Sequence, residues 1–152
     1  MAKKVLVFDI EDHLDFELMG IICAHRDFRL CFEINETTDL GFRKTDDLQL
    51  KLEKKHSTSY FSLYQYINLD GEEYFLITNR GTNGLFIPEQ KHIDYFLLLR
   101  NKAPYTSTEL LLEKLKSITI VNSALQIDPG SLKSADHFLY IEAEKKSDLT
   151  NG

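Results

Sequence analysis

Apolar residues along this chain follow two periods, and each period predicts its own elements. Apolar and polar positions alternate over 28–34 and again over 48–52, which is typical of a strand with one face on a core. The segments 58–67 and 73–78 flank an Asp-Gly pair, Asp70-Gly71, and predict a β-hairpin. That pair accepts the positive φ angles of a tight turn.

Three further strands are predicted from β-branched and aromatic content. They are residues 5–10, residues 93–100, which are dense in Tyr, Phe and Leu, and a closing strand at 138–141. Periodicity alone leaves a helix open for 93–100. A β-branched run within 117–127 adds a fourth candidate, and Asp-Pro-Gly at 128–130 ends it in a turn.

Two helices are predicted. The first follows the acidic stretch 11–15, where Asp12 or Asp15 would be the N-cap and where negative charge suits the helix dipole. The second starts at Thr106, which forms a capping-box pattern with Glu109. The apolar faces would comprise Leu14, Leu18, Ile21 and Ile22 in the first helix and Leu111, Leu112, Leu115 and Ile118 in the second.

The order of these elements predicts an α+β fold. Strands that mostly follow one another form a mostly antiparallel sheet, and the two main helices pack on one face of it. Residues 1–143 would form a single domain, and residues 144–152, which are polar, a frayed C-terminal tail. A chain of 152 residues can bury a sizeable core without a metal or a disulfide.

Charge and cysteine content exclude several classes. Lys plus Arg number 18 against 24 Asp plus Glu, a formal net charge of −6, which disfavours nucleic-acid binding. No apolar run is long enough to span a membrane, and the start of the chain does not resemble an export signal, so we expect a cytoplasmic protein. Cys23 and Cys31 are then reduced structural thiols.

Local motifs offer little catalytic chemistry. The carboxylates within 9–15 follow the first predicted strand but lack the Asp-x-Asp-x-Thr order of a phosphatase, so helix capping explains them better. Arg80 precedes Gly81 and Gly84 in a loop that could wrap an anion, although a plain connecting loop is favoured. The histidines show no metal-ligand spacing, and we expect no metal or cofactor.

A row of tyrosines raises a different possibility. Alternation over 58–67 would place Tyr60, Tyr64 and Tyr66 on one face of a strand. If exposed, this face would suit a protein partner, or RNA bases in a weaker alternative. Ordinary cross-strand packing is the simpler interpretation.

One segment resembles a known family. Residues 87–95 read Ile-Pro-Glu-Gln-Lys-His-Ile-Asp-Tyr, which is similar to the signature of the uncharacterised bacterial IPExxxVDY family, with Ile93 in place of valine. The stretches 16–21, 34–35 and 95–97 extend the resemblance over much of the chain. The family has no established activity, so the resemblance implies which residues to watch and no mechanism.

These observations favour a non-catalytic protein-interaction or regulatory module with a protein partner that the sequence does not identify. The candidate binding residues are Pro88, Glu89, Asp94, Tyr95 and Arg80, although the motif could be purely structural, with its carboxylates stapling a turn. The alternative is a small-molecule binder or enzyme that uses a carboxylate-rich pocket. A homodimer through an exposed sheet edge is a further possibility, and the sequence does not say which edge.

Overall fold

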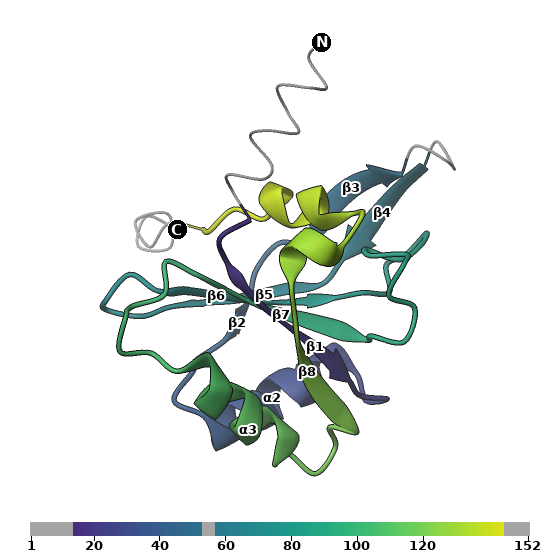
Figure 1. The fold of residues 1–152 in the computed structure, drawn as a ribbon. Helices are drawn as coiled ribbons and strands as arrows, with labels where there is room; N and C mark the ends of the chain where they lie inside the picture. Colours follow the sequence, from purple (N-terminus) through teal and green to yellow (C-terminus); the bar gives the residue numbers. More distant parts are fainter. Residues whose placement is uncertain (1–13, 53–56, 145–152) are drawn as a thin grey trace.

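A six-stranded antiparallel sheet organises the fold (Figure 1). The computed structural model describes residues 14–52 and 57–144. In spatial order the strands are β2 (Arg43–Lys44), β5 (Leu63–Ile67), β6 (Glu73–Thr78), β7 (Tyr95–Arg100), β1 (Glu17–Ile22) and β8 (Ser123–Ile127). A separate hairpin pairs β3 (Leu48–Leu52) with β4 (Ser57–Phe61). The predicted α+β class with a mostly antiparallel sheet is confirmed.

Both helices cover the same face of the sheet, as predicted. α2 (Asp27–Thr37) and α3 (Thr108–Lys116) lie side by side below the sheet in Figure 1. Their buried residues form one cluster with every second residue of the central strands, including Leu97 and Leu99 of β7. This is the packing expected when a sheet face meets the apolar stripes of helices.

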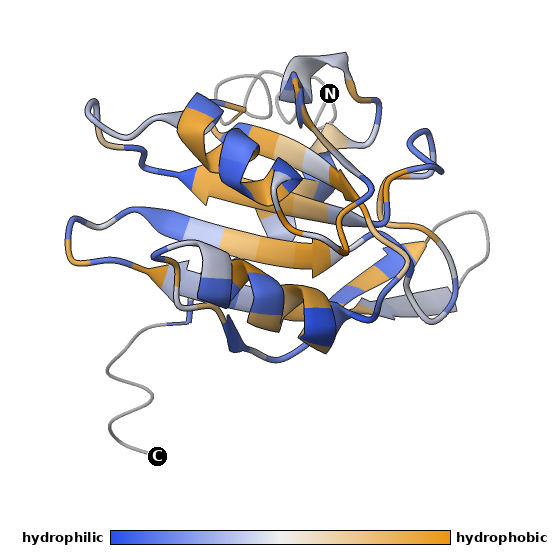
Figure 2. Ribbon diagram, turned by 90° about the horizontal axis from the view of Figure 1, so that it is seen from below, coloured by the Kyte–Doolittle hydropathy of each residue, from blue (hydrophilic) through white to orange (hydrophobic). Residues whose placement is uncertain are grey.

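The opposite face of the sheet is covered by the β3–β4 hairpin and the C-terminal segment (Figure 1). That segment contains two short 3-10 helices, η2 (Pro129–Ser131) and η3 (Ala135–Tyr140). Phe138 of η3 lies at the centre of this layer, with its ring centroid 5.1 Å from that of Phe86 and 5.4 Å from that of Phe96. In Figure 2 the hydrophobic colour accordingly follows the strands between the two layers.

The prediction of a first helix after the acidic stretch 11–15 is wrong, because residues 17–22 form strand β1. β1 lies between β7 and β8, and its four middle residues are buried. A strand that is buried on both faces has no alternation of apolar and polar residues, so its apolar run resembles a helical face. Gly20 suits the close packing here, since a Cβ would lie 2.8 Å from Ile127 Cδ1.

The predicted strand over 28–34 is also wrong, because this segment lies in helix α2. The residues that α2 buries are Leu30, Cys31 and Ile34. Ile34 lies four residues after Leu30 and three after Cys31, so all three share one face of the helix. Phe28 and Phe32 are exposed, and it is their two aromatic rings that imitate the alternation of a strand.

The C-terminal strand predictions need smaller corrections. The β-branched residues 118–121 lie in the turn before β8, so only 123–127 of the predicted segment pair with β1. Residues 138–141 form the end of η3 and the residue after it instead of a closing strand. Glu144, in the predicted tail, is bound through its main chain to the Gln65 side chain. Its N–H donates to Gln65 Oε1 and its carbonyl accepts from Gln65 Nε2, both at 2.9 Å.

The tyrosine row does not form one exposed face, because the chain leaves β4 at residue 62 and enters a different sheet as β5. Tyr60 is exposed, whereas Tyr64 is buried in the helix-side cluster and Tyr66 is partly buried against it. The strand predicted at 5–10 and the carboxylates at 9–12 lie outside the described residues.

The first prediction concerns the C-terminal layer. Replacing the fully buried Phe138 by alanine should lower the free energy of unfolding by about 3–5 kcal/mol, because a large cavity opens between three other rings. Tyr140→Ala, on the same 3-10 helix but 58% exposed, should change it by less than about 1 kcal/mol. Urea denaturation measures both, and equal effects would contradict the packing described here.

Glu72 closes the end of the sheet at which β6 begins, and it is only 2% exposed. Its Oε2 accepts a hydrogen bond of 2.8 Å from the Ala103 main-chain N–H, and its Oε1 accepts from Asn68 at 2.8 Å and Tyr74 at 3.2 Å. Burial raises the pKa of this carboxyl, but these bonds and one from Thr106 outweigh burial, so the pKa lies below 4.5.

The second prediction follows from the ionised state of Glu72. Glu72→Gln should cost about 1–3 kcal/mol of stability at neutral pH, because an amide cannot accept all of these donors. The carboxylate stabilises the fold above its unfolded pKa and loses that contribution as the pH falls through its lower folded pKa. The stability gap between wild type and variant should therefore shrink below about pH 4.5.

Chemical denaturation across a pH series measures this gap. Glu113→Gln is the control, since Glu113 is exposed and forms only a surface ion pair with Lys116. This control should stay within about 0.5 kcal/mol of wild type. A Glu72→Gln gap that remained constant down to about pH 3 would contradict the lowered pKa.

Candidate functional site

The loop that carries residues 87–95 is held by one buried asparagine, Asn79, which directly follows β6. Its Nδ2 donates to the carbonyl oxygens of Gln90 at 2.9 Å and Ile93 at 2.8 Å, and its Oδ1 accepts from the Ile87 N–H at 2.8 Å. Its main-chain N–H donates to the carbonyl of Asp94 at 2.9 Å. Both ends of the motif are therefore fixed by a residue outside it.

Pro88 and Glu89 lie in an exposed turn of this loop. The carboxylate of Glu89 accepts hydrogen bonds from the main-chain N–H of Ser134 at 2.7 Å and from its hydroxyl at 3.0 Å. Burial raises the pKa of Glu89, but the two bonds from Ser134 and the charge of His137 outweigh it and lower the pKa. Glu89 thus joins the loop to the start of η3.

Asp94 and Tyr95 connect the beginning of β7 to the segment that follows β1. Asp94 Oδ2 accepts a hydrogen bond of 2.8 Å from the Cys23 N–H, and its Oδ1 lies 3.7 Å from Arg80 Nε. The Tyr95 hydroxyl donates to the His25 carbonyl at 2.5 Å. Burial, reinforced by nearby acidic groups, raises the pKa of Tyr95, so its hydroxyl stays protonated.

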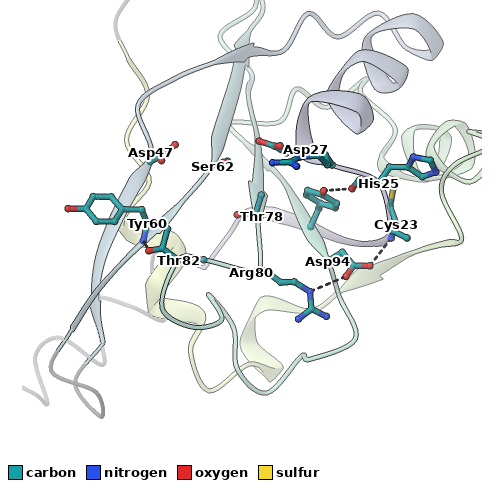
Figure 3. A pocket seen from close by; sticks show the side chains of 14 residues that line it. Cys23, His25, Asp27, Asp47, Tyr60, Ser62, Thr78, Arg80, Thr82 and Asp94 are labelled. Atoms are coloured by element: carbon teal, nitrogen blue, oxygen red, sulfur yellow. Dashed lines mark hydrogen bonds and ion pairs between the residues drawn. The ribbon is translucent and has the colours of Figure 1, made fainter.

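These contacts surround an open cleft of about 610 Å³ at the end of the sheet (Figure 3). We call it the arginine cleft. Its walls come from the segment between β1 and α2, from the end of β6 and the loop after it, and from β4 and the start of β7. Of the five candidate residues, Arg80, Asp94 and Tyr95 line it, whereas Pro88 and Glu89 do not.

The acidic residues of the arginine cleft are each held by a neighbour. Asp27 accepts a hydrogen bond of 2.9 Å from the Tyr64 hydroxyl, and Asp47 forms an ion pair of 2.7 Å with Lys44. Asp94 accepts from a main-chain N–H, as described above. Asp27 and Asp94 therefore hold segments of the fold together, whereas Asp47 lies in a half-exposed surface ion pair.

The basic residues of the cleft are much less engaged. The side chain of Arg80 is 67% exposed, and its long contact with Asp94 is its one ion pair among the described residues. Within the same part of the chain, the side chains of Arg26 and His25 take part in no hydrogen bond or ion pair, although Arg26 lies 5.9 Å from the Phe28 ring centroid. The guanidinium groups of Arg26 and Arg80 therefore keep donors that an anionic group could use, beside three aspartates of opposite charge.

Two further features of the cleft wall agree with a polar ligand. Arg26 is the N-cap of α2 and contributes no side-chain hydrogen bond, so the positive end of this helix at the cleft lacks the usual capping oxygen. Thr78 Oγ1 is buried in the wall and has no hydrogen-bond partner in the described structure. Unpaired buried polar atoms are uncommon and often mark places where a ligand or water binds.

The glycine loop after Arg80 has a structural role. Thr82 and Tyr60 exchange hydrogen bonds across the outer edge of β4: the Tyr60 N–H donates to Thr82 Oγ1 at 3.0 Å, and the Thr82 N–H donates to the Tyr60 carbonyl at 3.2 Å. A Cβ on Gly81 would lie 2.3 Å from Ser59 Oγ and 2.5 Å from the Phe61 ring. The loop protects a strand edge and, in doing so, positions Arg80.

The cleft offers neither a metal site nor an activated thiol. No group of three or more His, Cys, Asp or Glu residues within 14–52 and 57–144 could hold a metal ion. Cys23 lines the cleft, but burial and the charge of Asp94 raise the pKa of its thiol, which keeps it protonated and weakly nucleophilic. Both cysteines are unpaired and buried, Cys23 after β1 and Cys31 in α2 instead of in the predicted helix and strand.

Comparisons with protein-family models, with curated proteins and with solved structures give no match for this chain. Within the described residues, no helix has the length and apolar character needed to cross a membrane.

The third prediction tests the role of Asn79. Asn79→Ala should lower the free energy of unfolding by about 3 kcal/mol or more, because three main-chain groups of the motif loop lose their partner while buried. Asn122→Ala is the control, since the Asn122 side chain is exposed, and it should stay within about 0.5 kcal/mol of wild type. Thermal and urea unfolding measure both, and a loss under about 1 kcal/mol for Asn79→Ala would contradict this role.

Proposed function

We propose that this chain is a non-catalytic binding module, and that the arginine cleft takes an anionic group presented by a partner protein. The observation that carries the proposal is the difference in pairing inside the cleft. Asp27 and Asp94 accept hydrogen bonds from the fold, and Asp47 forms a surface ion pair with Lys44. Arg80, in contrast, projects into solvent with most of its donors available. A carboxylate or phosphate could accept two parallel hydrogen bonds from that guanidinium.

A pair of exposed aromatic residues supports a protein partner over a free small anion. Phe28 and Phe32 lie one helical turn apart on α2 and are 62% and 57% exposed. Phe28 is beside Arg26, which lines the cleft, so an apolar surface continues directly from the basic one. Aromatic and arginine side chains are the residues enriched at the centres of protein interfaces. The fitting ligand is a segment with an acidic and an apolar residue.

The motif at 87–95 and the two cysteines support proposals on the family and the compartment of this chain. We propose that the chain belongs to the bacterial IPExxxVDY family on the strength of residues 87–95, in which Pro88 and Glu89 shape the loop and Asp94 and Tyr95 reach the cleft. Two unpaired buried thiols agree with a reducing compartment such as the cytoplasm.

The fourth prediction tests the cleft with a variant that removes the positive charge of Arg80. Crosslinked affinity purification from native cells, followed by quantitative mass spectrometry, should enrich a partner with the wild-type protein. With Arg80→Gln the amount of recovered partner should fall about tenfold or more, because a charge-assisted hydrogen bond is worth about 1.5–3 kcal/mol. Arg80→Gln should fold normally, since its ion pair is exposed. Lys116→Gln is the control, because it removes an exposed cation of α3 that lines neither the cleft nor the Phe28–Phe32 surface, and it should keep the partner.

Two further experiments distinguish an anionic group on a partner protein from a free small anion. Phe28→Ser/Phe32→Ser should also lose the partner if the ligand belongs to a protein. Titration of isotope-labelled protein with inorganic phosphate or acetate, followed by amide chemical shifts of residues 25–28 and 78–82, detects a free anion. Arg80-dependent shifts without any protein partner would replace the interaction module by a small-anion binder. A partner retained by Arg80→Gln, or no response of the cleft in either arm, would overturn the proposal.

A further inference from the structure

The two edges of the six-stranded sheet are built differently. On one side the sheet ends with β2, which has only two residues, Arg43 and Lys44, both basic and exposed. On the other side it ends with β8, a strand of five residues that pairs with β1 alone among the described strands. Short, charged edge strands are a common protection against pairing with another chain. β2 has this protection and β8 does not.

β8 lacks three of the usual edge defences, namely charge, proline and a bulge. From Ser117 to Ile127 the chain contains no charged residue and no proline. The five residues of β8 pair with β1 in an unbroken register, without a bulge that would twist the edge away. Leu125 at the centre of the strand is 41% exposed. The outward-facing main-chain N–H and C=O groups of such a strand are a template for a further strand.

The hairpin shows that this fold does cover other edges. The outer edge of β4 is satisfied by the loop after β6: Thr82 bonds to Tyr60, and Asn83 Nδ2 donates to the Thr58 carbonyl at 2.7 Å. No comparable contact lies along β8 in the part of the chain described here, where its neighbours are β1 and, across one face, α3. Within residues 14–52 and 57–144, β8 is therefore the uncharged sheet edge that no other segment covers.

We infer that β8 pairs antiparallel with β8 of a second copy of this chain, across a two-fold axis at Leu125. This register places Leu125 opposite its own symmetry mate and Ala124 opposite Gln126. Just beyond the strand, Asn122 then faces Asp128, so that a carboxylate meets an amide and not a second carboxylate. Like charges directly opposite each other destabilise paired strands, and this pairing contains none.

Self-pairing explains the composition of the edge better than pairing with an unrelated strand. The net charge of −6 opposes association of two copies in general, whereas residues 117–127, which end in β8, carry no charge at all. Pairing would extend the sheet continuously across two molecules with an isologous contact, the commonest symmetry of homo-oligomers. No residue of β8 lines the arginine cleft, so the dimer leaves that site open in both copies.

The fifth prediction is the oligomeric state of the full chain. Analytical ultracentrifugation over a range of concentrations should detect a species of twice the 17.6 kDa chain mass. Leu125→Lys should weaken this association at least about tenfold, because it places two cations opposite each other at the two-fold axis. Leu110→Lys is the matched control: Leu110 is an exposed leucine on α3, and the dimer should persist.

A charge-pair experiment tests the register itself. Mixing Leu125→Lys with Leu125→Glu should restore a mixed dimer, since opposite charges then meet at the axis, while each variant alone stays monomeric. Circular dichroism should show both variants folded, as expected for an exposed position. A monomeric wild type would overturn the inference. If the β8 amides of such a monomer were protected from hydrogen exchange, a segment of the same chain would cover the β8 edge. A dimer unaffected by Leu125→Lys, or no rescue on mixing, would also overturn it.

Discussion

Burial of β7 on both of its faces is the constraint on which the rest of the structure depends. Its residues alternate between two separate cores, Leu97 and Leu99 toward the helices and Phe96 and Leu98 toward the opposite layer. A strand without a solvent face needs cover on both sides of its sheet. The helices supply one cover, and the β3–β4 hairpin with the C-terminal 3-10 helices supplies the other (Figure 1).

The same strand determines where the candidate site lies. β7 begins immediately after Asp94, so the motif loop must enter the sheet at this point, and Asn79 at the end of the neighbouring strand holds the loop in place. α2 begins at the same end of the sheet, which brings Arg26 and His25 to the cleft that Arg80 lines. Because the fold already uses the local carboxylates as acceptors, the guanidinium groups of Arg26 and Arg80 are the least engaged charged groups of the cleft.

Strong local signals predicted their elements well. The Asp-Gly turn at 70–71 joins β5 and β6, the apolar segment 93–100 contains β7, and the capping pattern near 106–109 precedes α3. The N-cap of α3 is Ser107, one residue after the predicted Thr106, and its side chain accepts from the Leu110 N–H at 3.2 Å. The first helix and the following strand were interchanged, because periodicity assumes that apolar residues are buried, and two exposed phenylalanines in α2 break that assumption.

The site was only partly accessible to sequence reasoning. The motif and the arginine loop drew attention to Arg80, Asp94 and Tyr95, but Asn79 gave no signal, since the groups it binds lie 8 to 14 residues away along the chain. Local turn and capping chemistry thus allowed the sequence by itself to determine the hairpin and the late helix. The order of the elements indicated the α+β class, and the density of apolar residues favoured the central strand without excluding a helix there. Only the tertiary structure decided which carboxylates accept hydrogen bonds, which cations keep exposed donors and which described strands lie at the edges of the sheet, because each depends on contacts between segments that are distant in sequence.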